Sequence, residues 1–92
     1  MASSSKYYMY IACCNDQSLY IGSTNNLVSR EKRHNEGKGS RYTRARLPVK
    51  IIYSEPFSTR KEAVKREFQI KGWTRIKKEN LVKYGKPNPI NL

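Results

Sequence analysis

Glu67 stands out in this sequence because its predicted helix should turn it toward the protein interior. At about 100° per residue, Glu67 falls near the middle of the apolar arc of segment 59–71. The residues that define this arc are Ala63, Val64, Phe68 and Ile70. An isolated buried carboxylate is very costly, so an inward Glu67 must be ion-paired, hydrogen-bonded or metal-bound. The alternative is a Glu67–Lys71 ion pair on a solvated edge of the helix.

A second predicted helix, 27–36, is unusually poor in apolar residues. Its only aliphatic residues are Leu27 and Val28, whereas Arg30 and His34 are four residues apart and therefore share one face. Either the helix packs loosely, or this inward face is a polar site. A lone His is usually structural and an Arg in a basic protein usually contacts phosphate, but together they are also candidates for a catalytic pair.

The N-terminal third predicts a β-hairpin that places two tyrosines side by side. Its strands are 6–14 and 19–21, separated by the turn signal Asn15-Asp16-Gln17. The aliphatic residues occupy odd positions and share one face only if odd residues pair with odd, through a loop of three or five residues. The opposite face then carries Tyr8, Tyr10, Tyr20 and Gly22. Tyr10 and Tyr20 are neighbours in this register.

The remaining signals complete an α+β domain, a small three-stranded antiparallel sheet flanked by three helices. Gly37 ends the first helix, a basic loop follows over 37–46, and the third strand is predicted at 49–54. Thr59 and Glu62 form a capping box at the start of the second helix, which runs to Lys71. A third helix is predicted from 73 to 84, stopped by Gly85 and Pro87. The domain is expected at 7–84, between an N-terminal tail at 1–6 and a C-terminal tail at 85–92.

Composition indicates a folded domain with a polyanionic partner. The chain has 92 residues with 19 Lys and Arg against 7 Asp and Glu, a net charge of +12. The hydrophobic fraction of 37% and the seven Tyr exclude a disordered basic tail. No apolar run approaches the ~20 residues needed to span a bilayer, and no signal peptide is visible. Adjacent Cys13 and Cys14 suit free thiols, and a cytoplasmic location is expected.

Several of these residues together resemble the GIY-YIG nuclease family. The segment Tyr20-Ile21-Gly22 matches the second half of the family's name motif, and Tyr8-Met9-Tyr10 stands where Gly-Ile-Tyr would be. Arg30, His34 and Glu67 follow in the family's order. The runs 34–39, 41–43 and 66–71 are similar to its small, single-domain YhbQ-like branch. The resemblance covers Tyr7 to Val82, nearly the whole chain.

The resemblance implies hydrolysis of phosphodiester bonds in DNA with one divalent metal ion. Glu67 would be the sole protein ligand of Mg²⁺ or Mn²⁺. Tyr10 would be the general base, and Tyr20 would position the attacking water or share its proton. Arg30 would stabilise charge on the pentavalent phosphorane. His34 would accept a hydrogen bond from a tyrosine.

The alternative to a nuclease is a non-catalytic nucleic-acid-binding module that uses the same basic surface. In it, cationic residues would contact phosphates and a base would stack on Tyr42. The residues expected to bind nucleic acid are Lys38, Arg41, Tyr42, Arg44, Arg46, Lys65 and Arg66, with Lys77 and Lys78 beside them. A third hypothesis is a small basic ribosome-associated or protein-docking factor, but no motif in the sequence supports it. The sequence is compatible with single-stranded or structured DNA, duplex DNA or RNA as the substrate. It is equally compatible with a role in DNA repair, recombination or defence, and with any oligomeric state.

Overall fold

The hairpin of β1 (Tyr7–Cys13) and β2 (Leu19–Thr24) forms the centre of the fold. The computed structural model describes residues 6–86. Ile11 pairs with Ile21 and Cys13 with Leu19, so odd residues pair with odd across a five-residue connection, 14–18. This register confirms the prediction from the odd-numbered aliphatic residues, because a shift by one residue would exchange the two faces of the strand.

The third strand, β3 (Lys50–Phe57), pairs antiparallel with the other side of β1, giving the order β2-β1-β3. It is longer than the predicted 49–54. The additional residues pair with the start of β1, where Tyr7 lies opposite Phe57 and Tyr8 opposite Pro56. Proline is compatible with this position because β3 is an edge strand.

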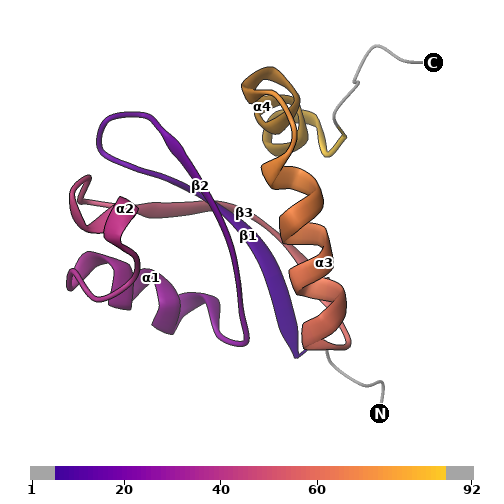
Figure 1. The fold of residues 1–92 in the computed structure, drawn as a ribbon, viewed down its shortest axis with the longest axis horizontal. Coiled ribbons are helices and arrows are strands. Elements are labelled where there is room, and N and C mark those ends of the chain that lie inside the picture. The colour runs from indigo at the N-terminus through magenta and orange to yellow at the C-terminus, as the bar shows by residue number, and fades with distance from the viewer. Residues whose placement is uncertain (1–5, 87–92) are drawn as a thin grey trace.

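Helices cover both faces of the sheet (Figure 1). On one face, α3 (Arg60–Lys71) and α4 (Arg75–Tyr84) pack over the hairpin. The buried residues of this layer are Met9, Ile11, Ile21, Ile70 and Leu81. On the other face, α1 (Leu27–Asn35) lies over a second cluster. Its buried residues are Tyr10, Ala12, Cys14 and Val49, with Leu27 and Tyr20 packed against them. The predicted α+β class and three-stranded sheet are confirmed.

Two predictions about the helices were wrong in detail. The basic segment 37–46 is not all loop, because it contains a short helix, α2 (Arg41–Arg44), started by a reciprocal capping box between Ser40 and Thr43. Phe68 does not belong to the buried arc of α3, since its relative exposure is 66%. Ala63 and Ile70 are the buried residues of that helix, and Glu67 shares their face because it lies four residues from one and three from the other.

The last described helix, α4, ends at Tyr84, as the sequence predicts. Thr74 caps α4, and Gly85 ends it with a positive φ of 80°, a conformation that favours glycine. Most of both predicted tails, including Pro87, lies outside the described residues. Cys13 and Cys14 are free thiols. Within residues 6–86, no helix is long and apolar enough to cross a membrane.

Candidate active site

A buried hydrogen bond between Tyr10 on β1 and His34 on α1 lies at the centre of the site. The Tyr10 hydroxyl and His34 Nε2 are 2.7 Å apart. Both side chains are buried, with exposures of 0% and 1%. The bond joins the hairpin to the polar face of α1, which explains why this helix has so few apolar residues.

Thr43 on α2 determines how the His34 ring is oriented. His34 Nδ1 lies 2.8 Å from the Thr43 hydroxyl, which is also within 3.3 Å of the Ser40 carbonyl oxygen. If the hydroxyl donates to that carbonyl, it can only accept from Nδ1–H, and the lone pair of Nε2 then faces Tyr10. This network therefore favours a neutral imidazole that accepts the proton of the Tyr10 hydroxyl.

The electrostatics of the site keep this donor and acceptor matched. Burial, together with the positive charge of Arg30, lowers the pKa of His34 and favours the neutral ring. Burial raises the pKa of Tyr10, and Tyr20 raises it further, whereas Arg30 opposes the shift. At neutral pH the free protein therefore holds a protonated phenol against a neutral imidazole.

Two glycines leave the space that these rings occupy. A Cβ atom at Gly22 would lie 2.6 Å from the Tyr10 hydroxyl oxygen, and one at Gly39 would overlap the His34 imidazole. Gly22 is therefore needed for the packing of Tyr10. The requirement for Gly39 is not visible in the sequence, because it depends on a ring five residues away in another element.

Tyr20 is the more accessible of the two site tyrosines. Its ring meets His34 edge-on at a centroid distance of 5.3 Å and lies 6.3 Å from the ring of Tyr10. It also stacks on Tyr42 at 6.3 Å. Tyr20 and Tyr42 line an open groove of about 320 Å³ together with Lys71 and Lys78. Tyr20 is only partly buried, so it connects the buried network to this groove.

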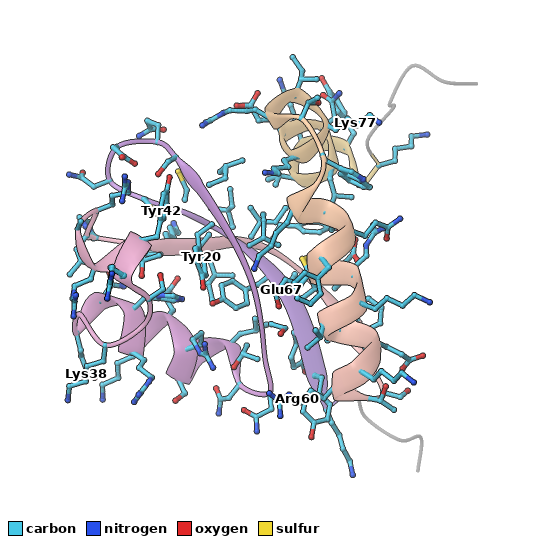
Figure 2. The ribbon with its side chains drawn as sticks, in the orientation of Figure 1. Tyr20, Lys38, Tyr42, Arg60, Glu67 and Lys77 are labelled. Carbon is cyan, nitrogen blue, oxygen red and sulfur yellow. The ribbon has the colours of Figure 1, made fainter. Side chains whose placement is uncertain are left out.

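Glu67 lies on α3, labelled in Figure 2, and its negative charge acts on Tyr10. The Ser23 hydroxyl donates a hydrogen bond of 2.8 Å to the carboxylate, and Lys71 Nζ lies 2.7 Å from its other oxygen. The Glu67 side chain is 14% exposed, against 44% for Lys71. The two alternatives from the sequence thus apply together, since Glu67 faces inward and is also paired with Lys71.

Arg30 completes the group of five residues singled out from the sequence. The positive charge of Arg30 opposes the rise in the pKa of Tyr10 and contributes to the lowered pKa of His34. The negative charge of Glu67 adds to the rise in the pKa of Tyr10. Among residues 6–86, no ion pair involves Arg30. The structure therefore brings Tyr10, Tyr20, Arg30, His34 and Glu67 together from β1, β2, α1 and α3. Sequence reasoning missed Ser23 and Thr43, whose partners become neighbours only in the folded chain.

The donor set fits a metal ion that keeps most of its water. The described residues contain no cluster of three or more His, Cys, Asp or Glu side chains. Glu67 instead offers one carboxylate next to the hydroxyl of Ser23. Mg²⁺ dehydrates reluctantly and is commonly held by only one or two carboxylates. The Glu67 side chain is 14% exposed and that of its ion-pair partner Lys71 is 44% exposed, so the carboxylate is not sealed from solvent.

The basic residues expected to bind nucleic acid fall into two groups. Lys38, Arg41, Arg44 and Lys65 are exposed. Arg66 is instead held by Glu55 at 2.7 Å, and Arg46 pairs with Asp16 at 3.0 Å while its guanidinium covers the ring of Tyr42 at 3.8 Å. Lys38 and Lys77 lie at opposite sides of the molecule in Figure 2. Arg46 and Arg66 therefore have internal partners in addition to any role toward nucleic acid.

Comparison with known proteins gives consistent matches over most of the chain. The family model of the GIY-YIG catalytic domain matches residues 6–80. A UPF0213 protein of Bacillus licheniformis is 51% identical over 76 residues, covering 83% of this chain and 78% of the relative. A UPF0213 protein of Staphylococcus epidermidis is 44% identical over 80 residues, covering 87% and 98%. The solution NMR structure of the UPF0213 protein BH0048 from Bacillus halodurans matches with a TM-score of 0.55 and 39% identity, covering 90% of this chain and 89% of that chain.

Proposed function

The chain belongs to the GIY-YIG family, and from this premise we propose that it is a divalent-metal-dependent endonuclease that hydrolyses phosphodiester bonds in DNA. The observation that carries the proposal is the hydrogen-bonded Tyr10–His34 pair, which lies within electrostatic reach of both Arg30 and Glu67. A purely structural network would not need a cation and a carboxylate that both act on the same buried phenol, Tyr10. This combination suits phosphoryl transfer, which depends on positioning and charge stabilisation.

We assign the contact with the attacking water to Tyr20, because Tyr10 is fully buried and its hydroxyl is bonded to His34. Tyr20 lines the open groove, and its ring rests edge-on against His34. A phenol with a reference pKa of ~10 acts as a base near neutral pH only if cations stabilise the phenolate. Lys71 lines the same groove. This proposal exchanges the roles that the resemblance implied for the two tyrosines.

Tyr10 and His34 act in this proposal as positioning residues. The O–H···N bond fixes the imidazole, and Thr43 fixes it from the other side. The ring of Tyr20 then packs against a rigid surface and cannot turn away from the groove. Arg30 has no carboxylate partner among the described residues, so its guanidinium is available to stabilise negative charge on the phosphoryl oxygens.

Glu67 would hold Mg²⁺ or Mn²⁺, with the Ser23 hydroxyl orienting its carboxylate. When bound, the metal ion supplies positive charge that polarises the phosphoryl group and favours the leaving oxygen. Lys71 would have to leave the carboxylate, and its exposure allows it to do so. The exposed cations Lys38, Arg41, Arg44 and Lys65 would contact backbone phosphates away from the reacting group.

The proposal is tested by single-turnover cleavage of DNA at saturating protein, where binding defects are masked. Single-stranded, branched and duplex DNA are compared with RNA in the presence of Mg²⁺ or Mn²⁺. We expect Glu67→Gln to abolish metal-dependent cleavage, whereas Glu36→Gln, which removes the same charge from an exposed position, cleaves like the parent. Parental cleavage by Glu67→Gln would contradict the one-metal mechanism. Tight, metal-independent binding without any cleavage would favour the non-catalytic binding module.

A further inference from the structure

A polar pocket lies next to the proposed active site, between the end of β2 and the first turn of α3. Its volume is about 280 Å³, close to the lower limit of ~300 Å³ for small-ligand pockets. Its polar lining consists of Tyr7, Ser23, Thr24, Asn25, Arg30 and Arg60. Arg60 is labelled in Figure 2 at the start of α3, at the opposite end of the helix from Lys71. Of these lining residues, only Arg30 is a site residue predicted from the sequence.

The charge of this pocket is unbalanced. Two arginines line it, and none of its lining residues is acidic. None of the ion pairs within residues 6–86 involves Arg30 or Arg60. Arg46, Arg66 and Arg75, in contrast, each have a carboxylate partner at 2.7–3.0 Å. Two arginines around one cavity, neither with a carboxylate partner among the described residues, are suited to an anion, because their planar guanidinium groups match the oxygens of a phosphate.

The positive charge of Arg60 does not stabilise the helix in which it lies. Arg60 is the first residue of α3, where a positive charge opposes the helix dipole. Arg60 is exposed, so its side chain contributes little to the core. Removing this charge should therefore leave the fold intact, which makes its role testable by substitution.

We propose that this pocket binds a backbone phosphate of the nucleic acid adjacent to the one that reacts, with Arg60 as its main ligand. Arg30 lines the pocket and also acts on Tyr10 and His34, so it lies between the two phosphate positions. Ser23 likewise lines the pocket while its hydroxyl is bonded to Glu67. Arg60 thereby fixes the strand relative to the reacting group. The inference rests on the proposed function for the source of the phosphate.

The test compares Arg60→Gln with Lys61→Gln, which removes the same charge from the next residue, one that does not line the pocket. Both substitutions are made with Glu67→Gln, so that the probe stays intact. The probe is a fluorescently labelled 12-nucleotide thymidine strand, and its affinity is measured across salt concentrations. We expect Arg60→Gln to weaken binding about tenfold more than Lys61→Gln, as for loss of a charge-assisted hydrogen bond. Its salt slope should fall by about 0.7, the value for one lost contact to single-stranded phosphate.

Equal affinities and equal slopes for the two variants would overturn the assignment. A second measurement separates nucleic acid from free phosphate, by titrating ¹⁵N-labelled protein with inorganic phosphate alone. Saturable shifts of the Arg60 side-chain signal, together with unchanged strand binding by Arg60→Gln, would also overturn it, because the pocket would then hold free phosphate. The result does not depend on catalysis. If Glu67→Gln still cleaves, the one-metal mechanism fails, while the Arg60 comparison is repeated on a non-hydrolysable strand.

Discussion

Tyr10→Phe separates the structural part of the network from the chemistry. The substitution removes only the hydroxyl that bonds His34 Nε2 at 2.7 Å. It leaves a fully buried ring nitrogen without a partner, at a cost of about 1–3 kcal/mol. For a chain of this size each kcal/mol lowers Tm by roughly 4–8 °C. We therefore expect a clear loss of stability from a change of one oxygen atom.

Urea unfolding followed by circular dichroism measures this loss, with Tyr8→Phe as the matched control. Tyr8 is on the same strand and only partly buried, and none of the hydrogen bonds in residues 6–86 involves its hydroxyl. Its substitution should change stability by less than about 0.5 kcal/mol. If Tyr10→Phe unfolds at the same midpoint as Tyr8→Phe, the buried bond to His34 does not exist as described. Cleavage gives a separate expectation. In single-turnover assays, Tyr20→Phe should slow cleavage more than Tyr10→Phe does, because the proposal assigns the contact with the attacking water to Tyr20.

Three further predictions concern the surroundings of His34. Burial lowers its pKa in the folded state, so the unfolded chain binds the proton more readily and stability should fall as pH drops below the unfolded value of ~6.5. Because His34 is the only histidine, His34→Asn should flatten this dependence in urea midpoints between pH 7.5 and 5.5, and an unchanged slope would contradict the assignment. Gly39→Ala should cost about 1–3 kcal/mol because its Cβ overlaps the imidazole, whereas Gly72→Ala meets only an ordinary contact at 3.6 Å and should be nearly neutral in the same assay. Thr43→Val should slow single-turnover cleavage while strand binding by anisotropy stays at the parental value, since the hydroxyl orients His34 and does not face the groove; weaker binding with normal cleavage would refute that role.

The parts of the site that the sequence predicts depend on local periodicity. The alternation of odd-numbered aliphatic residues predicts the register that places Tyr10 and Tyr20 on one face. The spacing of Glu67 from Ala63 and Ile70 predicts its inward direction along α3. Both inferences need only the geometry of one hairpin or one helix. The role of each residue in catalysis stays a prediction.

The parts that the sequence does not predict depend on contacts between distant elements. Ser23 meets Glu67 across 44 positions, and Thr43 meets His34 only because Ser40 starts a short helix in a segment that reads as a polar loop. The extension of β3 likewise follows from pairing with β1 and carries no local signal. The sequence predicts Arg66 as a surface cation on α3, whereas the structure shows it in an ion pair with Glu55 on β3. In each case the partner is supplied by tertiary structure.

The polar network also has a consequence for how stability and activity are coupled in this domain. Tyr10, His34 and Thr43 are among the largest fully buried side chains, so one of the two core layers is partly built from the site itself. Within residues 6–86, every buried side-chain nitrogen and oxygen has a hydrogen-bond partner. A small domain has little other core to compensate for losing one of them. Substitutions at these three positions should therefore lower stability and cleavage together, whereas substitutions at Tyr20, Arg30 and Glu67, which are only partly buried, should lower cleavage with a smaller effect on the fold.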